Sequence, residues 1–140
     1  CSDLSKYQIR DASKPVRSFC AFTSTPSQLR WNPLSAHILA SAHDGEVRIW
    51  DTRKTDTYVA FITAHFSSIS SLDWSPKKSE QLVTCAQDRH IKIWDINMPR
   101  EFKITTMTAK PVSKIRYTVL SLFILVQCIV SANIVYLAIW

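Results

Sequence analysis

The stretch that decides the fold is Glu46-Val47-Arg48-Ile49-Trp50-Asp51, and it recurs 44 residues later as His90-Ile91-Lys92-Ile93-Trp94-Asp95. In both copies residues of opposite polarity alternate, which is the period of two expected for a half-buried β-strand. Each copy ends in the dipeptide Trp-Asp. The sequence therefore predicts one strand that occurs twice, at equivalent places in two copies of a larger unit.

A second pair of anchors gives the length of that unit. Trp31-Asn32-Pro33 recurs 43 residues later as Trp74-Ser75-Pro76. Turn residues such as Asp44-Gly45 separate the apolar runs. A repeat of about 40–45 residues that ends in Trp-Asp is typical of the blades of a β-propeller. We therefore predict an all-β fold, a β-propeller fragment of about two blades.

Each blade is predicted to hold four short strands. They fall near 27–31, 37–42, 46–50 and 57–62 in the first blade and near 69–74, 80–85, 90–94 and 101–106 in the second. The predicted domains are the end of a preceding blade at 1–24, blades at 25–64 and 65–108, and the start of a third blade at 109–118. A propeller closes with about 4–8 blades, and the chain starts at Cys1 rather than at a methionine. We therefore expect a fragment of a longer protein.

The last segment, 119–140, breaks the pattern. It carries no charged residue, and Leu, Ile, Val, Phe and Ala make up most of it. A helix of about 20 apolar residues can span a membrane, and basic residues precede the segment, as is typical of a cytoplasmic domain. Two interpretations stay open. The segment is either a helix-like anchor, which would make the chain a tail-anchored membrane adaptor, or a gene-model artefact such as translated intron sequence.

Four polar side chains occupy positions that a blade would bring together. In the second blade they are His65, Thr84, Asp88 and Trp94, and the first blade keeps Ser41, Asp44 and Trp50. A buried indole N–H needs an acceptor, a hydroxyl supplies one, and an imidazole oriented by a carboxylate can continue the chain. We predict a structural network rather than a hydrolase triad, and no catalytic residue. In the first blade the histidine position falls on Phe22, so that blade is predicted to lack the full network.

The other histidines, the cysteines and the charge suggest no further chemistry. His37, His43 and His90 show no metal-ligand spacing and are interpreted as solvated turn residues. The four cysteines stand far apart, so they predict neither a zinc site nor a disulfide framework. The formal net charge is +6, but the basic residues are scattered, unlike the basic patch of a nucleic-acid-binding surface. We expect no metal, no cofactor, no small-molecule substrate and no nucleic-acid partner.

Residues 16–118 resemble the WD-repeat family. The stretches that carry the resemblance are Ser13-Lys14-Pro15-Val16-Arg17, His43-Asp44-Gly45-Glu46-Val47-Arg48-Ile49-Trp50-Asp51, Leu72-Asp73-Trp74 and Lys114-Ile115-Arg116-Tyr117-Thr118. They are similar to members of the family that belong to the GATOR/SEA assembly. This resemblance implies a non-catalytic scaffold in the cytoplasm, at the lysosomal or vacuolar membrane surface. Its implied partners are other β-propeller scaffold proteins in a multi-subunit complex, and its implied role is amino-acid signalling to the target-of-rapamycin kinase.

A shorter motif suggests an alternative function. Trp50-Asp51-Thr52-Arg53 is similar to the W-D-x-R box by which some WD-repeat proteins dock onto the adaptor of cullin-4 ubiquitin ligases. Arg53 would present a fork-shaped donor at one face of the propeller. The second blade reads Trp94-Asp95-Ile96-Asn97 and lacks the arginine. The alternative is therefore a substrate receptor of a cullin-4 ligase that docks through Arg53.

Overall fold

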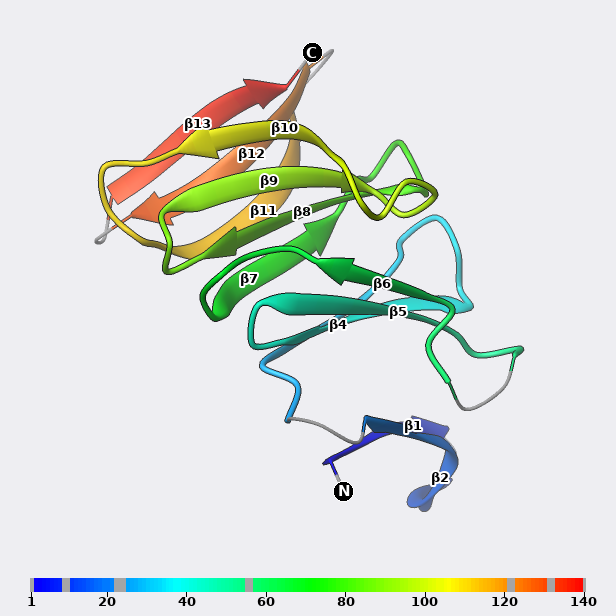
Figure 1. Cartoon of the computed structure of the whole chain (residues 1–140). Coiled ribbons are helices and arrows are strands. Elements are labelled where there is room, and N and C mark those ends of the chain that lie inside the picture. Colours follow the sequence, from blue (N-terminus) through cyan, green and yellow to red (C-terminus); the bar gives the residue numbers. More distant parts are fainter. Residues whose placement is uncertain are drawn as a thin grey trace.

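The structure is a computed structural model of the whole chain. It describes the backbone of residues 2–8, 11–21, 25–54, 57–120, 123–130 and 133–139, and the side chains of residues 25–54, 57–118 and 129. Thirteen strands are present in these residues. Figure 1 shows them as antiparallel sheets that lie side by side along the chain.

Two four-stranded sheets correspond to the two predicted blades. The first sheet has the order β3-β4-β5-β6, with bounds Gln28–Trp31, Ile38–His43, Glu46–Asp51 and Ala60–Thr63. The second has the order β7-β8-β9-β10, with bounds Ile69–Trp74, Gln81–Ala86, His90–Asp95 and Phe102–Met107. Both sheets are simple meanders in which every strand pairs with its neighbour in sequence. The predicted strands and the predicted place of Trp50 and Trp94 in the third strand of each sheet are confirmed.

The largest shift from the predicted strands lies at β6. The sequence predicted this strand near 57–62, whereas β6 begins at Ala60. Its ladder with β5 runs from the pair Ile49–Ala60 to the pair Glu46–Thr63. Residues 57–59, which precede Ala60, are exposed and lie outside the ladder. The sequence therefore located the strand but overstated its length.

The turns between the second and third strands differ by one residue. Asp44-Gly45 joins β4 to β5, whereas Gln87-Asp88-Arg89 joins β8 to β9. The extra residue explains why the repeat spacing is 43 residues before the turn and 44 after it. The left-handed residue also changes place: Asp44 has φ 51°, and Arg89 has φ 65°. This difference decides where the two turn aspartates can reach.

Buried apolar side chains fill the spaces between neighbouring sheets. One cluster joins Val47, Ile49 and Ile62 of the first sheet to Leu72 and Leu82 of the second. Another joins strands β8 and β9 to the first strand of the next sheet and consists of Val83, Cys85, Ile91, Ile93, Val112 and Ile115. Burial of this apolar surface is the main favourable contribution to folding. The core therefore lies between blades, as in a protein of stacked repeats.

Polar contacts link the same sheets along their first strands. The indole N–H of Trp74 donates to the carbonyl of Arg30 at 3.0 Å. The backbone N–H of Tyr117 donates to the carboxylate of Asp73 at 2.9 Å. Trp74 and Tyr117 occupy equivalent repeat positions, 43 residues apart. A polar contact at this repeat position thus joins each pair of sheets, although the groups that make it differ.

The C-terminal segment corrects the expectation of a helix-like tail. A third sheet has the order β11-β12-β13, with bounds Val112–Leu120, Phe123–Val130 and Asn133–Ile139. The expected start of a third blade thus continues through two further paired strands. An apolar run does not by itself distinguish a strand from a helix, and this one is rich in valine and isoleucine, whose branched side chains favour strands. Among the described residues, none of the elements is a helix that could cross a bilayer.

The N-terminal residues form a separate two-stranded pair. Strand β1, Ser2–Gln8, runs antiparallel to β2, Asp11–Ala21. Within the predicted end of a preceding blade at 1–24, residues 11–21 form β2. Phe22, the position at which the histidine of the first blade was sought, lies outside the described residues.

Candidate functional site

Four side chains of the second blade form one continuous hydrogen-bonded chain. The indole N–H of Trp94 donates to Oγ1 of Thr84 at 3.0 Å. Thr84 Oγ1 lies 2.8 Å from Nε2 of His65, and Nδ1 of His65 lies 2.9 Å from Oδ2 of Asp88. A carboxylate can only accept, so Nδ1 carries the proton and Nε2 accepts from the hydroxyl of Thr84. The structure thus brings together His65, Thr84, Asp88 and Trp94.

Burial fixes the charge state of this chain. Loss of water lowers the pKa of His65, and the hydrogen bond that His65 donates to Asp88 opposes that effect without overcoming it. Burial acts to raise the pKa of Asp88, but hydrogen bonds from the backbone N–H of His90 and from His65 outweigh it and lower that pKa. The pair is therefore a neutral imidazole beside a carboxylate. The hydroxyl of Thr84 is wholly buried and already has two partners, so the network stabilises the blade and offers no reactive oxygen.

The first blade contains a different network, and it corrects our interpretation of His43. The indole N–H of Trp50 donates to Oγ of Ser41 at 2.7 Å, and Ser41 Oγ lies 2.9 Å from Nε2 of His43. His43 was expected to be solvated, yet it is only 1% exposed. It stands two residues after Ser41 on strand β4 and therefore on the same face of the sheet. The two-residue spacing from Ser41 could have indicated this contact, but His43 directly precedes the Asp44-Gly45 turn and was therefore interpreted as a turn residue. Of the other two histidines, His37 is exposed and His90 half-buried.

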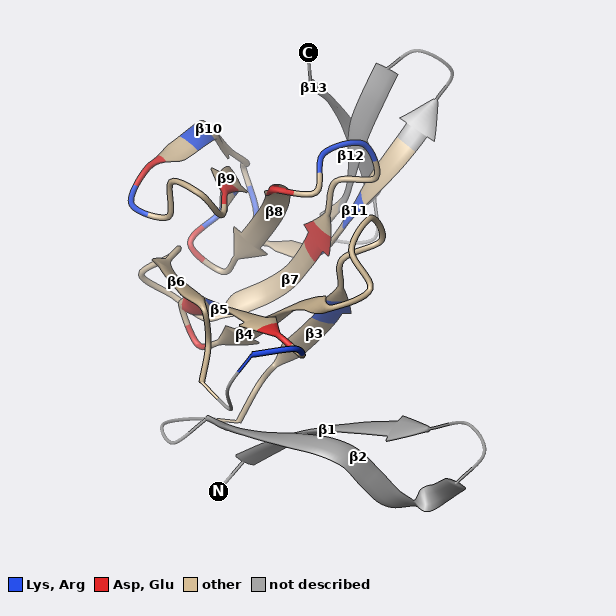
Figure 2. Cartoon of the chain, turned by 90° about the vertical axis from the view of Figure 1, so that its right-hand side faces the viewer, with Lys and Arg blue, Asp and Glu red and all other residues tan. Residues whose placement is uncertain are grey.

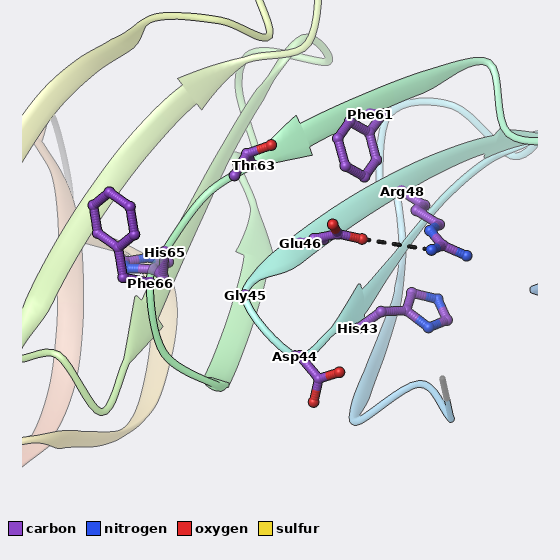
Figure 3. Close-up of a pocket in the computed structure, with 9 residues that line it drawn as sticks. All are labelled: His43, Asp44, Gly45, Glu46, Arg48, Phe61, Thr63, His65 and Phe66. Carbon is purple, nitrogen blue, oxygen red and sulfur yellow. Dashed lines mark hydrogen bonds and ion pairs between the residues drawn. The ribbon is translucent and has the colours of Figure 1, made fainter. Parts of the chain in front are cut away.

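The structure does not bring Asp44 into the network of the first blade. Its side chain is exposed in the two-residue turn, and Figure 3 shows the carboxylate pointing away from His43. In the longer turn of the second blade, Asp88 instead reaches His65 and also accepts the backbone N–H of His90 at 3.0 Å. The aspartate of the longer turn therefore joins a network, whereas Asp44 in the shorter turn does not.

Both aspartates of the Trp-Asp dipeptides have a cationic partner. Asp51 binds Arg53 through two contacts, Nε to Oδ1 at 3.1 Å and Nη2 to Oδ2 at 2.9 Å. These hydrogen bonds hold the pKa of Asp51 well below its usual range and raise that of Arg53. Asp95 instead binds Nζ of Lys103 at 2.7 Å, which helps to lower the pKa of Asp95. Lys103 was not singled out from the sequence, because it belongs to a neighbouring strand and no spacing rule connects it to Asp95.

The pairing of Arg53 limits what the arginine can offer a partner. One edge of its guanidinium is occupied by Asp51, and the side chain is 62% exposed. A guanidinium carries five N–H donors. Asp51 therefore holds the side-on fork of Nε and Nη2, and the exposed side chain has further N–H donors to offer a partner.

The rim of both blades exposes apolar and charged side chains. On the described residues of the outer strands and the segments that lead into them, large apolar side chains reach the surface: Tyr58, Val59, Phe61, Phe102, Ile104 and Met107. Figure 2 shows basic and acidic residues interspersed over the same part of the chain, without a continuous basic band in the described residues. Mixed surfaces of this kind suit contacts with proteins. The expectation that nucleic acid is not a partner stays a prediction.

Comparison with known families supports the repeat assignment. Residues 13–51 and 56–95 match the family described as WD domain, G-beta repeat. Each matched stretch ends at the aspartate of a Trp-Asp dipeptide, Asp51 or Asp95. The two matches cover more than half of the chain.

Several curated proteins are similar to this chain. A GATOR2 complex protein, WDR59, from Homo sapiens is 42% identical over 112 residues, which cover 80% of this chain and 11% of that protein. The Drosophila melanogaster GATOR2 complex protein Wdr59 is 37% identical over 80% of this chain and 12% of its own length. Maintenance of telomere capping protein 5 from Saccharomyces cerevisiae is 30% identical over 79% of this chain. The chain spans about a tenth of the length of these relatives.

A solved structure supports the fold. A chain in the crystal structure of a mitotic checkpoint complex matches with a TM-score of 0.75 over 89% of this chain and 37% of that chain. The sequence identity is 19%, so the likeness concerns the fold alone. It shows that the fold is that of a β-propeller fragment.

Proposed function

This chain belongs to the WD-repeat family, and we propose that it serves as a scaffold subunit of a GATOR2-type complex. The family is one of non-catalytic scaffolds. In the protein as a whole, the scaffold would assemble with other β-propeller proteins and take part in amino-acid signalling to the target-of-rapamycin kinase. We place it in the cytoplasm, at the lysosomal or vacuolar membrane surface.

The observation that carries the proposal is how the two blades use their polar groups. The side chains that resemble a catalytic set are buried and satisfied within the blades, as the fully buried Thr84 and Ser41 show. What reaches the surface is a rim of aromatic, aliphatic and charged side chains. Aromatic residues and arginine are the side chains that contribute most to protein interfaces. Similarity to GATOR2 complex proteins supports the choice of assembly.

The test is purification of the full-length protein under native conditions from cells, with its partners identified. The proposal expects other β-propeller subunits in stoichiometric amounts. It also expects that cells lacking the protein show an altered response of target-of-rapamycin kinase substrates when amino acids are withdrawn and restored. A protein that purifies alone, with an unchanged kinase response in its absence, would contradict the proposal.

The exposed guanidinium of Arg53 supports a second candidate function, docking onto the adaptor of a cullin-4 ubiquitin ligase. Its side chain is 62% exposed, which suits a docking arginine, although Asp51 holds one edge of the guanidinium. Co-purification of the cullin adaptor with the wild-type protein, and its loss in Arg53→Ala, is the result expected of this candidate. Recovery of other propeller subunits without the adaptor favours the GATOR2-type scaffold instead.

A further inference from the structure

A concavity of about 630 Å³ opens beside the turn between β4 and β5 (Figure 3). The turn residues Asp44 and Gly45 and the first residue of β5, Glu46, line its base. Phe61 of β6 and Phe66 of the connection between β6 and β7 stand on two sides of it. The pocket is therefore built from three segments of the first blade and its junction with the second.

The two phenylalanines face solvent. Phe66 is 101% exposed and Phe61 is 37% exposed. Phenylalanine is usually buried, and an exposed ring at the rim of a pocket is typical of a surface that meets a partner. The face of an aromatic ring attracts a cation through its quadrupole. These rings therefore suit an apolar stem that carries a positive charge.

The charges around the pocket are negative in sum. Asp44 is exposed, and the side chain of Glu46 is 40% exposed. Arg48 is the cation that lines the pocket, but its Nη2 lies 3.5 Å from Oε2 of Glu46 and its guanidinium packs 5.5 Å from the ring centroid of Tyr58. Burial lowers the pKa of His65, so its ring adds no positive charge. The lining of the pocket therefore carries two carboxylates and one guanidinium, and this guanidinium also packs on an aromatic ring.

The base of the pocket is rigid. The carbonyl of Gly45 accepts the backbone N–H groups of Ala64 at 3.0 Å and His65 at 2.9 Å, and the carbonyl of Asp44 accepts that of Ile69 at 2.7 Å. A Cβ at Gly45 would collide with the carbonyl oxygen of His65, so only glycine permits this approach. The turn backbone from which both carboxylates project is therefore fixed before a partner arrives, which reduces the entropy lost on binding.

We propose that this concavity binds a lysine or arginine side chain of a partner protein, with the aliphatic stem against Phe61 and Phe66 and the cation beside Asp44 and Glu46. The volume exceeds that of one side chain, so residues that flank the cation fit as well, which favours a protein segment over a free ion. The proposal rests on the scaffold function proposed above and adds the type of side chain that the scaffold recognises.

Saturation-transfer NMR on the full-length protein tests the chemistry directly. The probes are the N-acetyl amides of arginine, lysine, norleucine and glutamate, of which norleucine has an aliphatic stem without charge. The variants are Phe66→Ala and Asp44→Asn, because a fully exposed ring can be removed without a cavity and asparagine tolerates the positive φ of Asp44. The matched control is Met98→Ala, which is exposed in the connection at the opposite end of the strands.

The expected result is transfer to the arginine and lysine probes above that to norleucine, with a loss of roughly two- to fivefold in each pocket variant and no change in Met98→Ala. Equal transfer to norleucine, stronger transfer to glutamate, or cationic binding that neither pocket variant reduces would each overturn the proposal. Native purification distinguishes a failure of the pocket proposal from a failure of the proposed scaffold function. Assembly without cationic binding overturns only the pocket, whereas a protein that purifies alone overturns the scaffold function.

Discussion

Ser41 and Thr84 occupy the same position in the two blades, and each hydroxyl accepts a hydrogen bond from the indole N–H of its own blade, at 2.7 and 3.0 Å. The imidazole that pairs with the hydroxyl differs. Ser41 is hydrogen-bonded to His43, two residues along its own strand, whereas Thr84 donates to His65 from the connection between the blades. In each blade a buried tryptophan needs an acceptor for its indole N–H, and a hydroxyl supplies it. The histidine that pairs with this hydroxyl comes from a different segment in each blade.

The longer network predicts a difference between the two turn aspartates. Removal of the Asp88 carboxylate in Asp88→Ala leaves His65 Nδ1 and the backbone N–H of His90 without their acceptor. Each unsatisfied buried group costs about 1–3 kcal/mol. Asp44→Asn keeps the positive φ and alters an exposed side chain, so it should change the free energy of unfolding by less than about 0.5 kcal/mol. Urea unfolding of the complete propeller measures both, and equal losses would contradict the network.

The shorter network predicts that His43, on β4, contributes more to the stability of the fold than His37, in the turn that precedes β4. His43→Ala removes a buried ring and leaves the hydroxyl of Ser41 without its imidazole partner. We expect it to lower the free energy of unfolding by at least about 2 kcal/mol. His37 is exposed, with a single long contact to Thr52, so His37→Ala should cost less than about 0.5 kcal/mol. Comparable urea midpoints for the two variants would show that His43 is dispensable.

The neutral state of His65 predicts a loss of stability in mild acid. Its pKa is lowered in the folded protein from 6.5. Below about pH 6.5 the unfolded chain therefore binds more protons than the folded one, so stability is complete above this pH and falls as the pH drops toward the folded pKa. The groups that face His65 are Asp88, which favours protonation, and Lys92 and His90, which oppose it.

The measurement is the free energy of unfolding of the complete propeller between pH 7.5 and about 5, for the wild type and for His65→Gln. Glutamine keeps a polar group but does not titrate. The wild type should lose more stability than the variant over this window. Parallel curves for the two proteins would assign the pH dependence to other groups.

The strands were predictable because the local order of polar and apolar residues determines where they form. Alternation of polarity and the Trp-Asp endings placed β5 and β9 within a residue of their observed ends. The change of repeat spacing from 43 to 44 residues also marked the turn that holds the extra residue. The partners of side chains were less predictable. His43 looked like a turn residue because it precedes Asp44, and Lys103 reaches Asp95 across a ladder whose register the sequence does not specify.

The C-terminal segment shows where composition misleads. Twenty-two residues without charge satisfy the length criterion for a membrane helix, and that criterion ignores side-chain branching. Strands β12 and β13 pair in register from Ile124–Ile139 to Val130–Asn133. The repeat length was the better guide, because a shift of β7 by 43 residues gives 112–117, which falls within β11, Val112–Leu120.

The register of this sheet can be tested by a disulfide across β12 and β13. The Cα atom of Cys128 pairs with that of Val135. Residues paired across antiparallel strands lie about 4.5–5.5 Å apart, which a disulfide can bridge. In a helix the same two residues would be seven positions apart, or about 10 Å at a rise of 1.5 Å per residue, beyond the reach of a disulfide.

Val135→Cys in the full chain should therefore form a bond with Cys128 under mild oxidation, seen by mass spectrometry of proteolytic fragments. Leu137→Cys is the matched control, because Leu137 pairs with Val126 and should link to Cys128 far less. A Val135→Cys protein in which Cys128 stays unlinked, or links no faster than in Leu137→Cys, would rule out this register and favour the alternative of a helix in this segment.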